Sequence, residues 1–216
     1  MKYTIITCIL ILYGAVPAAI AKTPSTEYFR NMPQFWGQLY GKGGETLYCG
    51  QSFGPFKGRG INIEHVFPMG WVAKDLNCGK RSQCRTTSAK FNRIEADMHN
   101  LYPARAKINK TRSSYAYGII QGELRRFGRC DFEIDQQKRL AEPRPEVRGN
   151  IARAMLYMHT TYDLKLFSRQ GKLLIKWHRN DPPDREEQRR NRIIEHLQGV
   201  HNPFIDNPGL ADNLRF

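Results

Sequence analysis

The amino-acid sequence predicts an α+β fold that is mainly helical, with a small amount of sheet. Residues 147–162 place apolar side chains at steps of three and four, as a helix with one buried face requires. Residues 61–68 and 130–135 are short runs of strand character, and the second alternates apolar and acidic side chains. No internal repeat or low-complexity linker divides the chain. We therefore expect a single domain over residues 22–216.

The first 21 residues are set apart from this domain as a secretory signal peptide. Lys2 supplies a positive charge, residues 4–16 are almost uninterrupted apolar, and Ala-Ile-Ala at 19–21 is a small-residue cleavage site. A membrane anchor is the alternative, but the apolar run is shorter than the roughly 18–20 residues that a membrane-spanning helix needs. We expect an exported protein, periplasmic or secreted, with no membrane partner.

The first half of the domain is expected to mix loops with short helices and one strand. Residues 25–40 carry aromatic side chains at helical spacing, and Pro33 is expected to break that helix. The glycine-rich stretch that follows predicts loops around a short strand holding Cys49. After the strand at 61–68, the polar residues 74–90 are expected to form a surface loop.

Helices dominate the second half. Pro103 suits the first turn of a helix starting at Ala104. Three longer helices should follow: one after Pro143 and Pro145, one from a Ser168 cap to about Trp177, and one from Asp181-Pro182 to Gly199. The basic run at residues 189–192 is more typical of a solvated helix face than of a nucleic-acid patch.

Four cysteines remain once Cys8 leaves with the signal peptide. An even number in an exported chain predicts two disulfides, with three possible pairings. Cys78 and Cys84 would close a short loop, so we expect Cys78–Cys84 together with Cys49–Cys130. A zinc site is the alternative, but the paired C-x-x-C spacing is missing.

The mature chain is strongly basic. Leaving out Lys2, 33 basic residues face 20 acidic ones, a net charge of +13. Such a surface favours a polyanion such as DNA, RNA or an anionic surface. Phosphate contacts of this kind give affinity without reading the base sequence.

A candidate catalytic site begins at Glu64 and His65. Neighbours in a regular strand point to opposite faces, but Pro68 limits the strand, so both side chains could approach one site near its end. For this stretch alone, a surface carboxylate beside a satisfied histidine is the simpler interpretation. Residues 94–112 favour a functional site over this simpler interpretation, because they add Asn109. The amide oxygen of Asn109 and the carboxylate of Glu64 are oxygen ligands of the kind that Mg²⁺ prefers.

The same stretch carries basic side chains that could contact nucleic acid: Arg105, Lys107, Lys110 and Arg112.

Several stretches of the chain, taken in order, resemble the bacterial endonuclease I family of nonspecific periplasmic and secreted nucleases. That family belongs to the ββα-metal or His-Me finger class. They cover nearly all of the mature chain: IEHVFPMGW (63–71), GKRSQC (79–84), EADMHNLYPA (95–104), IN with the downstream arginine (108–112), RGNIARAMLYM (148–158) and GVHNPFI (199–205).

The resemblance implies a ββα-metal core and a set of roles. Glu64 and Asn109 match the ligands of a single Mg²⁺, for which Mn²⁺ or Ca²⁺ can substitute in binding. His65 matches the general base, and Arg81 matches an arginine that holds the phosphate. Supporting roles fall to Glu95, to Lys57 or Arg59, and to His99. Departures include Ile63 in place of tryptophan, and four mature cysteines where members often have eight.

The function that the resemblance implies is nonspecific hydrolysis of phosphodiester bonds in double- and single-stranded DNA, with RNA as a further substrate, by a monomer that leaves 5′-phosphorylated ends. An exported basic protein that binds DNA without catalysis is the main alternative. A zinc enzyme using His65 and His99 is a weaker one, because no H-E-x-x-H pattern occurs. For His99 a structural role is favoured, and His201-Asn202 should tie the tail to the core. Arg148 and Arg153 are expected to form salt bridges.

Overall fold

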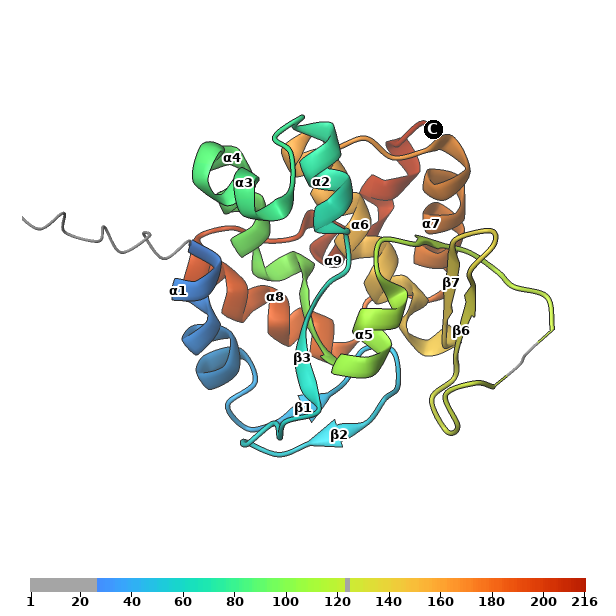
Figure 1. Ribbon diagram of the computed structural model, residues 1–216, viewed down its shortest axis with the longest axis horizontal. Helices are drawn as coiled ribbons and strands as arrows, with labels where there is room; N and C mark the ends of the chain where they lie inside the picture. The colour runs from blue at the N-terminus through green and yellow to red at the C-terminus, as the bar shows by residue number, and fades with distance from the viewer. Residues whose placement is uncertain (1–26, 123–124) are drawn as a thin grey trace, which may run out of the picture.

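The computed structural model describes residues 27–122 and 125–216, and Figure 1 shows their arrangement. The predicted signal peptide lies outside the described residues. The protein is an α+β fold made mainly of helices, as the sequence predicts, with three small sheets. No helix in these two ranges is long and apolar enough to cross a membrane.

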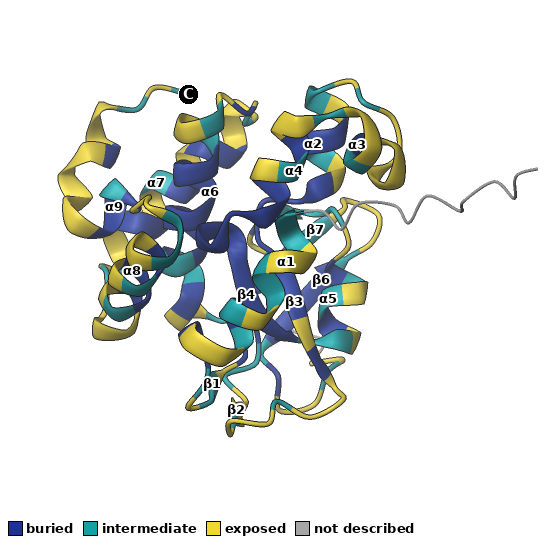
Figure 2. Ribbon diagram, turned by 90° about the vertical axis from the view of Figure 1, so that its left-hand side faces the viewer, coloured by how far each residue is buried: buried dark blue, intermediate teal, exposed yellow. Residues whose placement is uncertain are grey.

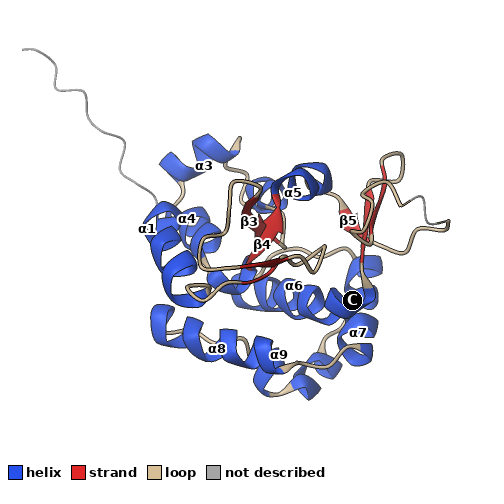
Figure 3. Ribbon diagram, turned by 90° about the horizontal axis from the view of Figure 1, so that it is seen from below, coloured by secondary structure: helices blue, strands red, loops and turns tan. Residues whose placement is uncertain are grey.

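The element that positions the site is an antiparallel pair of strands followed by a short helix. β3 (Ile61–His65) pairs with β4 (Leu101–Arg105), and α5 (Ala106–Arg112) follows β4 directly. Figure 3 shows this pair in the middle of the molecule, with the three-stranded sheet set apart at one side. The ββα order agrees with the predicted core.

Pro103 lies inside β4, opposite Ile63, so the prediction that it opens a helix is wrong. A two-stranded sheet consists only of edges, where a proline can be accommodated because its missing N–H is not needed for pairing. Its carbonyl still accepts a hydrogen bond from the Leu47 N–H at 2.8 Å. The helix therefore begins two residues later than its predicted start at Ala104.

Between β3 and β4 the chain forms helices, where a surface loop was predicted for residues 74–90. These are α2 (Met69–Asp75), α3 (Arg81–Thr87), α4 (Ala89–Ala96) and the 3-10 turn η2 (Met98–Asn100). The Ser88 hydroxyl accepts a hydrogen bond from the Phe91 N–H and caps α4. Phe91 and Ile94 are fully buried, so a few apolar positions fold an otherwise polar segment.

The N-terminal segment also differs from its prediction. α1 (Glu27–Gln34) runs through Pro33 and continues as a π-helical turn, η1 (Phe35–Leu39), so the proline does not break it. Widened π turns of this kind are a known way to absorb a local irregularity in a helix. Cys49 lies in the turn between β1 (Gly44–Glu45) and β2 (Ser52–Phe53) and not in a strand.

The C-terminal half supplies the scaffold. A sheet in the order β5-β7-β6 precedes it, and α6 is buried almost along its whole length, as Figure 2 shows. The elements of this half are β5 (Ala116–Tyr117), β6 (Phe132–Asp135), β7 (Leu140–Pro143), η3 (Pro145–Val147), α6 (Arg148–Tyr162), α7 (Ser168–Asn180), α8 (Arg185–Gln198), α9 (Pro203–Asp206) and η4 (Pro208–Asn213).

Helix boundaries in this half match the predictions in part. α8 ends at Gly199, which adopts the left-handed conformation that favours glycine. Its start is later than predicted, because Asp184 forms a capping box with Glu187. Ser168 is the first residue of α7 and not its cap, since Phe167 occupies the cap position.

Candidate active site

A groove of about 660 Å³ opens over the end of β3 and the face of α5. Its lining brings together side chains from four separate parts of the chain. Among them are Tyr28, Trp36, Lys57, Glu64, His65, Arg81, Arg85, Asn109 and Lys110. Six of these nine are predicted site residues, and the lining is rich in cations.

Glu64 lies at the floor of this groove, and side chains of the described residues engage only one of its two carboxylate oxygens. Oε1 accepts a hydrogen bond from the Tyr48 hydroxyl at 2.6 Å and lies 3.2 Å from Nη1 of Arg112. Oε2 has no side-chain partner among the described residues, and the backbone N–H of His65 is the further group that favours the charged carboxylate. Burial raises the pKa of Glu64, while Arg112 and the Tyr48 hydrogen bond oppose that shift.

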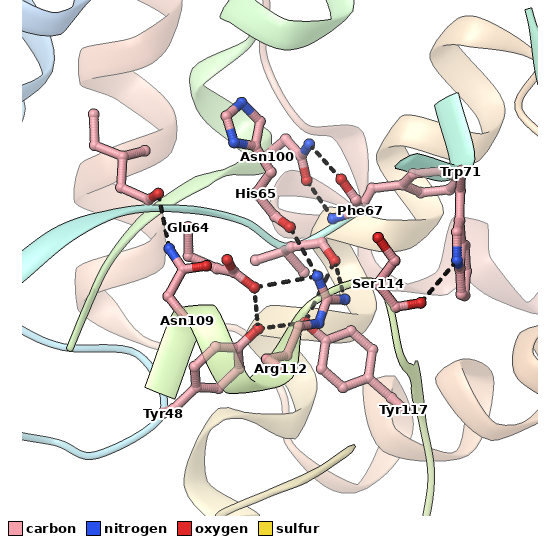
Figure 4. Close-up of polar contacts among 12 residues, drawn as sticks. Tyr48, Glu64, His65, Phe67, Trp71, Asn100, Asn109, Arg112, Ser114 and Tyr117 are labelled. Carbon is pink, nitrogen blue, oxygen red and sulfur yellow. Dashed lines mark hydrogen bonds and ion pairs between the residues drawn. The ribbon is translucent and has the colours of Figure 1, made fainter. Parts of the chain in front are cut away.

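Asn109, on α5, turns its amide oxygen toward this carboxylate (Figure 4). Both amide hydrogens are engaged, because Nδ2 donates to Asn62 Oδ1 at 3.0 Å and to the Ile63 carbonyl at 3.0 Å. The amide oxygen is therefore held away from the strand and on the side of Glu64. Two hard oxygen atoms face one another here, which fits Mg²⁺ or Ca²⁺ better than zinc.

The rival zinc arrangement finds no support in the described part of the chain. There, no three His, Cys, Asp or Glu side chains gather closely enough to hold a metal ion. A carboxylate paired with an amide agrees with a hard cation that keeps most of its own waters.

His65 ends β3 and lines the groove with its ring buried. Its Nε2 lies 3.0 Å from the Glu95 carbonyl oxygen, which can only accept, so Nε2 carries the hydrogen. Nδ1 then has a free lone pair. Burial, with the positive charge of Arg81 second, lowers the pKa of His65 from the ordinary imidazole value near 6.5 to about 3.

Two arginines of α3, Arg81 and Arg85, lie beside the His65 imidazole, and one buried carboxylate holds both. Arg81 Nε lies 2.5 Å from Oε1 of Glu95, and Arg85 Nε lies 2.8 Å from Oε2. Glu95 is fully buried, while 43% of the Arg81 side chain stays exposed. Glu95 thus holds both guanidinium groups by their inner nitrogens, which leaves the outer nitrogens available to an anion such as a phosphate.

Comparison with known proteins assigns the chain to the family that its sequence resembles. A family model described as Endonuclease I matches residues 32–209. The chain is 37% identical over 205 residues to a periplasmic deoxyribonuclease of Aeromonas hydrophila, covering 83% of this chain and 86% of the relative. The chain belongs to the endonuclease I family.

Two further relatives of this chain extend the comparison. An extracellular deoxyribonuclease of Aeromonas hydrophila is 36% identical over 213 residues, which are 88% of this chain and 92% of the relative. An extracellular ribonuclease of Bacillus amyloliquefaciens is 34% identical over 136 residues, 55% of this chain and 46% of the relative. The names of these relatives place them outside the cytoplasm, and this chain is likewise an exported protein.

The other basic side chains predicted for the site of this endonuclease I protein divide into those that lie at the groove and those that do not. Lys57 lies at the groove edge, where Nζ donates to the Ile61 carbonyl at 2.9 Å and sits 5.1 Å from the Trp36 ring centre. Arg59 is exposed and does not line the groove. Lys110 lines it, while Arg105 and Lys107 lie outside that lining.

Arg112 corrects the sequence-based prediction, because it is 1% exposed and cannot contact nucleic acid. Nη1 donates to the His65 carbonyl at 3.0 Å and Nη2 to the Val66 carbonyl at 2.6 Å. The guanidinium also stands 4.6 Å from the Tyr117 ring centre. Arg112 therefore fixes the end of β3, and with it the positions of Glu64 and His65.

Sequence reasoning missed three residues that shape the site. Tyr48 donates to Glu64, and its hydroxyl lies 2.7 Å from that of Tyr117. Only the adjacency of Tyr48 to Cys49 hinted at a fixed position. Arg85 could have been found, because it follows Arg81 by four residues on one helix and so shares its face.

Both predicted disulfides form, and each braces a segment of the site. Cys49–Cys130 joins the turn next to Tyr48 to the segment before β6. Cys78–Cys84 closes the loop that leads into α3, where Arg81 lies.

The other predicted structural residues act outside the groove. His99 is buried, with Nε2 3.2 Å from the Val200 carbonyl and its ring 4.7 Å from that of Tyr157. The Asn202 side chain donates to the Arg153 carbonyl at 3.1 Å, so it ties the tail to α6 as expected. His201 contacts Asp206 on the exposed side of α9.

The predicted salt bridges also form. The basic run at residues 189–192 agrees only in part with the predicted solvated helix face. Arg148 pairs with Glu142 at 2.7 Å, and Arg153 pairs with Glu187. Within residues 189–192, Arg190 is buried and donates to the Leu101 carbonyl at 2.9 Å, so it stabilises the fold and does not form a nucleic-acid patch.

Proposed function

We propose that the protein is an exported endonuclease that hydrolyses phosphodiester bonds of DNA and RNA, with His65 as the general base. The observation that carries this proposal is one basic groove holding three atoms that no described side chain engages: Nδ1 of His65, Oε2 of Glu64 and the amide oxygen of Asn109. A protein that only binds DNA would need the cations but not this arrangement.

Glu64 and Asn109 are the residues that would hold one Mg²⁺, and Mn²⁺ or Ca²⁺ could take the same oxygen ligands in binding. When bound, the cation would stabilise the negative charge that develops on the phosphate and the leaving oxygen. Arg112 and Tyr48 hold Glu64 at Oε1, so they leave Oε2 as the oxygen that faces the ligand.

His65 accepts a proton from the attacking water at Nδ1. Its Nε2–H bond to the Glu95 carbonyl keeps the ring oriented and stabilises the positive charge that the ring gains. The low pKa keeps the imidazole neutral throughout the neutral range, at the cost of basicity, so the base is always in its reactive form. The bond to the 3′ oxygen breaks, which leaves a 5′-phosphate.

Arg81 and Arg85, which line the same groove as His65, bind the phosphate oxygens. Both are charged hydrogen-bond donors held by Glu95, and such charge-assisted bonds are about twice as strong as neutral ones. Their contacts go to phosphate and not to base edges, so low base specificity is expected. The names of the deoxyribonuclease and ribonuclease relatives support both nucleic acids as substrates.

The test is plasmid cleavage by the purified mature protein with Mg²⁺ and with EDTA. His65→Ala should lower the rate by on the order of 10²–10⁴, the usual contribution of a general base, while DNA binding is kept. His201→Ala is the matched control, since that exposed imidazole lies outside the groove. Cleavage by His65→Ala at the wild-type rate would refute the role of His65, and a wild type that binds but never cleaves would support the binding protein.

A further inference from the structure

A second hollow of about 550 Å³ adjoins the catalytic groove. The two share Gly70 and Ser114 in their linings, so one continues into the other across the start of α2. Figure 4 shows Ser114 and Trp71 beside Arg112, on the side away from Asn109. A strand bound at His65 could therefore run on into this hollow.

Aromatic rings form the wall of the hollow. Phe67 meets Trp71 edge to face at 5.8 Å, and Trp71 meets Phe167 in the same way at 5.8 Å. Trp71 is fixed by the bond from its Nε1 to the Ser114 carbonyl at 2.9 Å. The outermost ring, Phe167, is 68% exposed, so it is accessible to a ligand in the hollow.

Positive charge surrounds these rings. Lys74, Arg139 and Lys165 all line the hollow and are exposed. Asp75 is the one acidic residue in its lining, and it lies 3.6 Å from the Lys165 ammonium. The rim therefore carries a positive excess around an apolar wall, a composition suited to a strand with both phosphates and flat bases.

We infer that this hollow, which we term the Phe167 subsite, binds unpaired nucleotides of the substrate strand next to the cleaved phosphate. One base would stack on the exposed Phe167 ring, and Lys74 and Arg139 would contact the flanking phosphates. A paired base keeps its faces stacked on its neighbours, so the subsite favours single strands or locally opened duplex. The inference rests on the proposed nuclease function and extends it to substrate preference.

The test compares two substrates of different length. A short single-stranded oligonucleotide extends into the Phe167 subsite, whereas the 5′-p-nitrophenyl ester of thymidine monophosphate fills only the catalytic groove. Phe167→Ala should lower the ratio of kcat/KM for the oligonucleotide over that for the small diester by about tenfold, the size of one base–aromatic stack, mainly through KM. Lys74→Ala should lower the ratio in the same direction and make KM less dependent on salt.

Matched controls lie elsewhere on the surface. Ile119→Ala removes another exposed apolar side chain, and Lys172→Ala removes another exposed lysine, and neither lines the groove or the Phe167 subsite. Both should leave the ratio unchanged. An unchanged ratio in Phe167→Ala would overturn the inference.

Oligonucleotide affinity in the His65→Ala background separates this inference from the proposed function. If wild type cleaves neither substrate, the nuclease proposal fails, and binding still tests the subsite. A Phe167→Ala loss in binding that is equal for single strands and blunt duplex would overturn the preference for unpaired nucleotides.

Discussion

Two buried arginine–glutamate pairs differ in how fully the carboxylate is used. In the scaffold, Arg153 Nε lies 2.7 Å from one oxygen of Glu187 and Nη2 lies 2.5 Å from the other, so both oxygens are engaged. In the groove, Arg112 reaches a single oxygen of Glu64 at 3.2 Å. The scaffold pair is closed on itself, whereas the groove pair keeps one oxygen for a ligand.

The cost of burial explains why the two arrangements have different purposes. A buried ion pair is stable only when nearly all of its charged atoms are satisfied, as at Glu187. Glu64 meets that condition less fully, because side chains of the described chain engage only one of its oxygens. Burial raises the pKa of both Glu64 and Glu187, so the two sites differ in hydrogen bonding and not in the direction of the pKa shift. An incompletely paired buried carboxylate beside a basic groove is typical of a functional site.

The largest expected effect is on catalysis by Glu64→Gln. The substitution keeps the shape but removes the charge that would hold the cation, so several kcal/mol of transition-state stabilisation are lost and kcat should fall by about 10³ or more. Single-turnover cleavage of a labelled oligonucleotide at saturating protein measures this effect without contribution from binding.

The matched control is Glu187→Gln, which breaks the closed pair. It should lower the free energy of unfolding by about 3–5 kcal/mol, because the Arg153 charge stays buried without its partner. The folded protein should keep a kcat near that of wild type. If Glu187→Gln lowers kcat as much as Glu64→Gln does, the contrast between the two pairs is wrong.

A smaller effect should appear in stability when the cation is added. At about one hundred times its Kd, Mg²⁺ should raise the free energy of unfolding by about 2.7 kcal/mol, or the Tm by roughly 5–10 °C for a domain of this size. Thermal unfolding followed by circular dichroism measures the shift. Glu64→Gln should lose it, because the open oxygen belongs to that carboxylate, and an equal shift in Glu64→Gln would place the cation elsewhere.

The smallest effect concerns a second matched pair, the imidazoles of His65 and His99. Burial lowers the pKa of His99, so between that pKa and about 6.5 the unfolded chain binds a proton that the folded chain does not. The free energy of unfolding is therefore highest above pH 6.5 and falls as the pH drops below it. His99→Gln keeps a donor for the Val200 carbonyl but removes this titration.

Urea unfolding at several pH values between 5 and 8 measures that change. The slope below pH 6.5 should become shallower in His99→Gln, by at most about 1.4 kcal/mol for each pH unit. His65 and His178, whose pKa values burial also lowers, still contribute to the remaining slope. Because His99 lies outside the groove, kcat at pH 8 should not change, and a slope identical to that of wild type would contradict a buried neutral His99.

Local sequence signals predicted much of the fold where they act on their own neighbours. Pro68 limits β3, Gly199 ends α8, and the apolar steps of residues 147–162 predict α6. The helices of residues 74–90 were missed because only Cys84 is fully buried there, and the apolar anchors Phe91 and Ile94 lie beyond the stretch. A polar composition alone does not distinguish a loop from short helices that bury few side chains.

The site was predicted to the extent that its residues are recognisable by their chemistry. Glu64, His65, Arg81 and Asn109 meet in one groove as the sequence suggested. Arg112 was placed wrongly because its partners, the carbonyls of His65 and Val66 and the carboxylate of Glu64, lie far from it in the sequence. Nothing in the residues next to an arginine tells whether its charge faces water or a strand end.

The placement of the three tryptophans gives this protein an intrinsic optical reporter. Trp36 lines the catalytic groove and Trp71 the Phe167 subsite, whereas Trp177 is buried against Arg148 in the scaffold. Nucleic acid that enters either hollow should quench emission from the first two without altering the third. Unfolding would instead shift the Trp177 spectrum to the red, so the same fluorescence trace can distinguish occupancy from denaturation without a label.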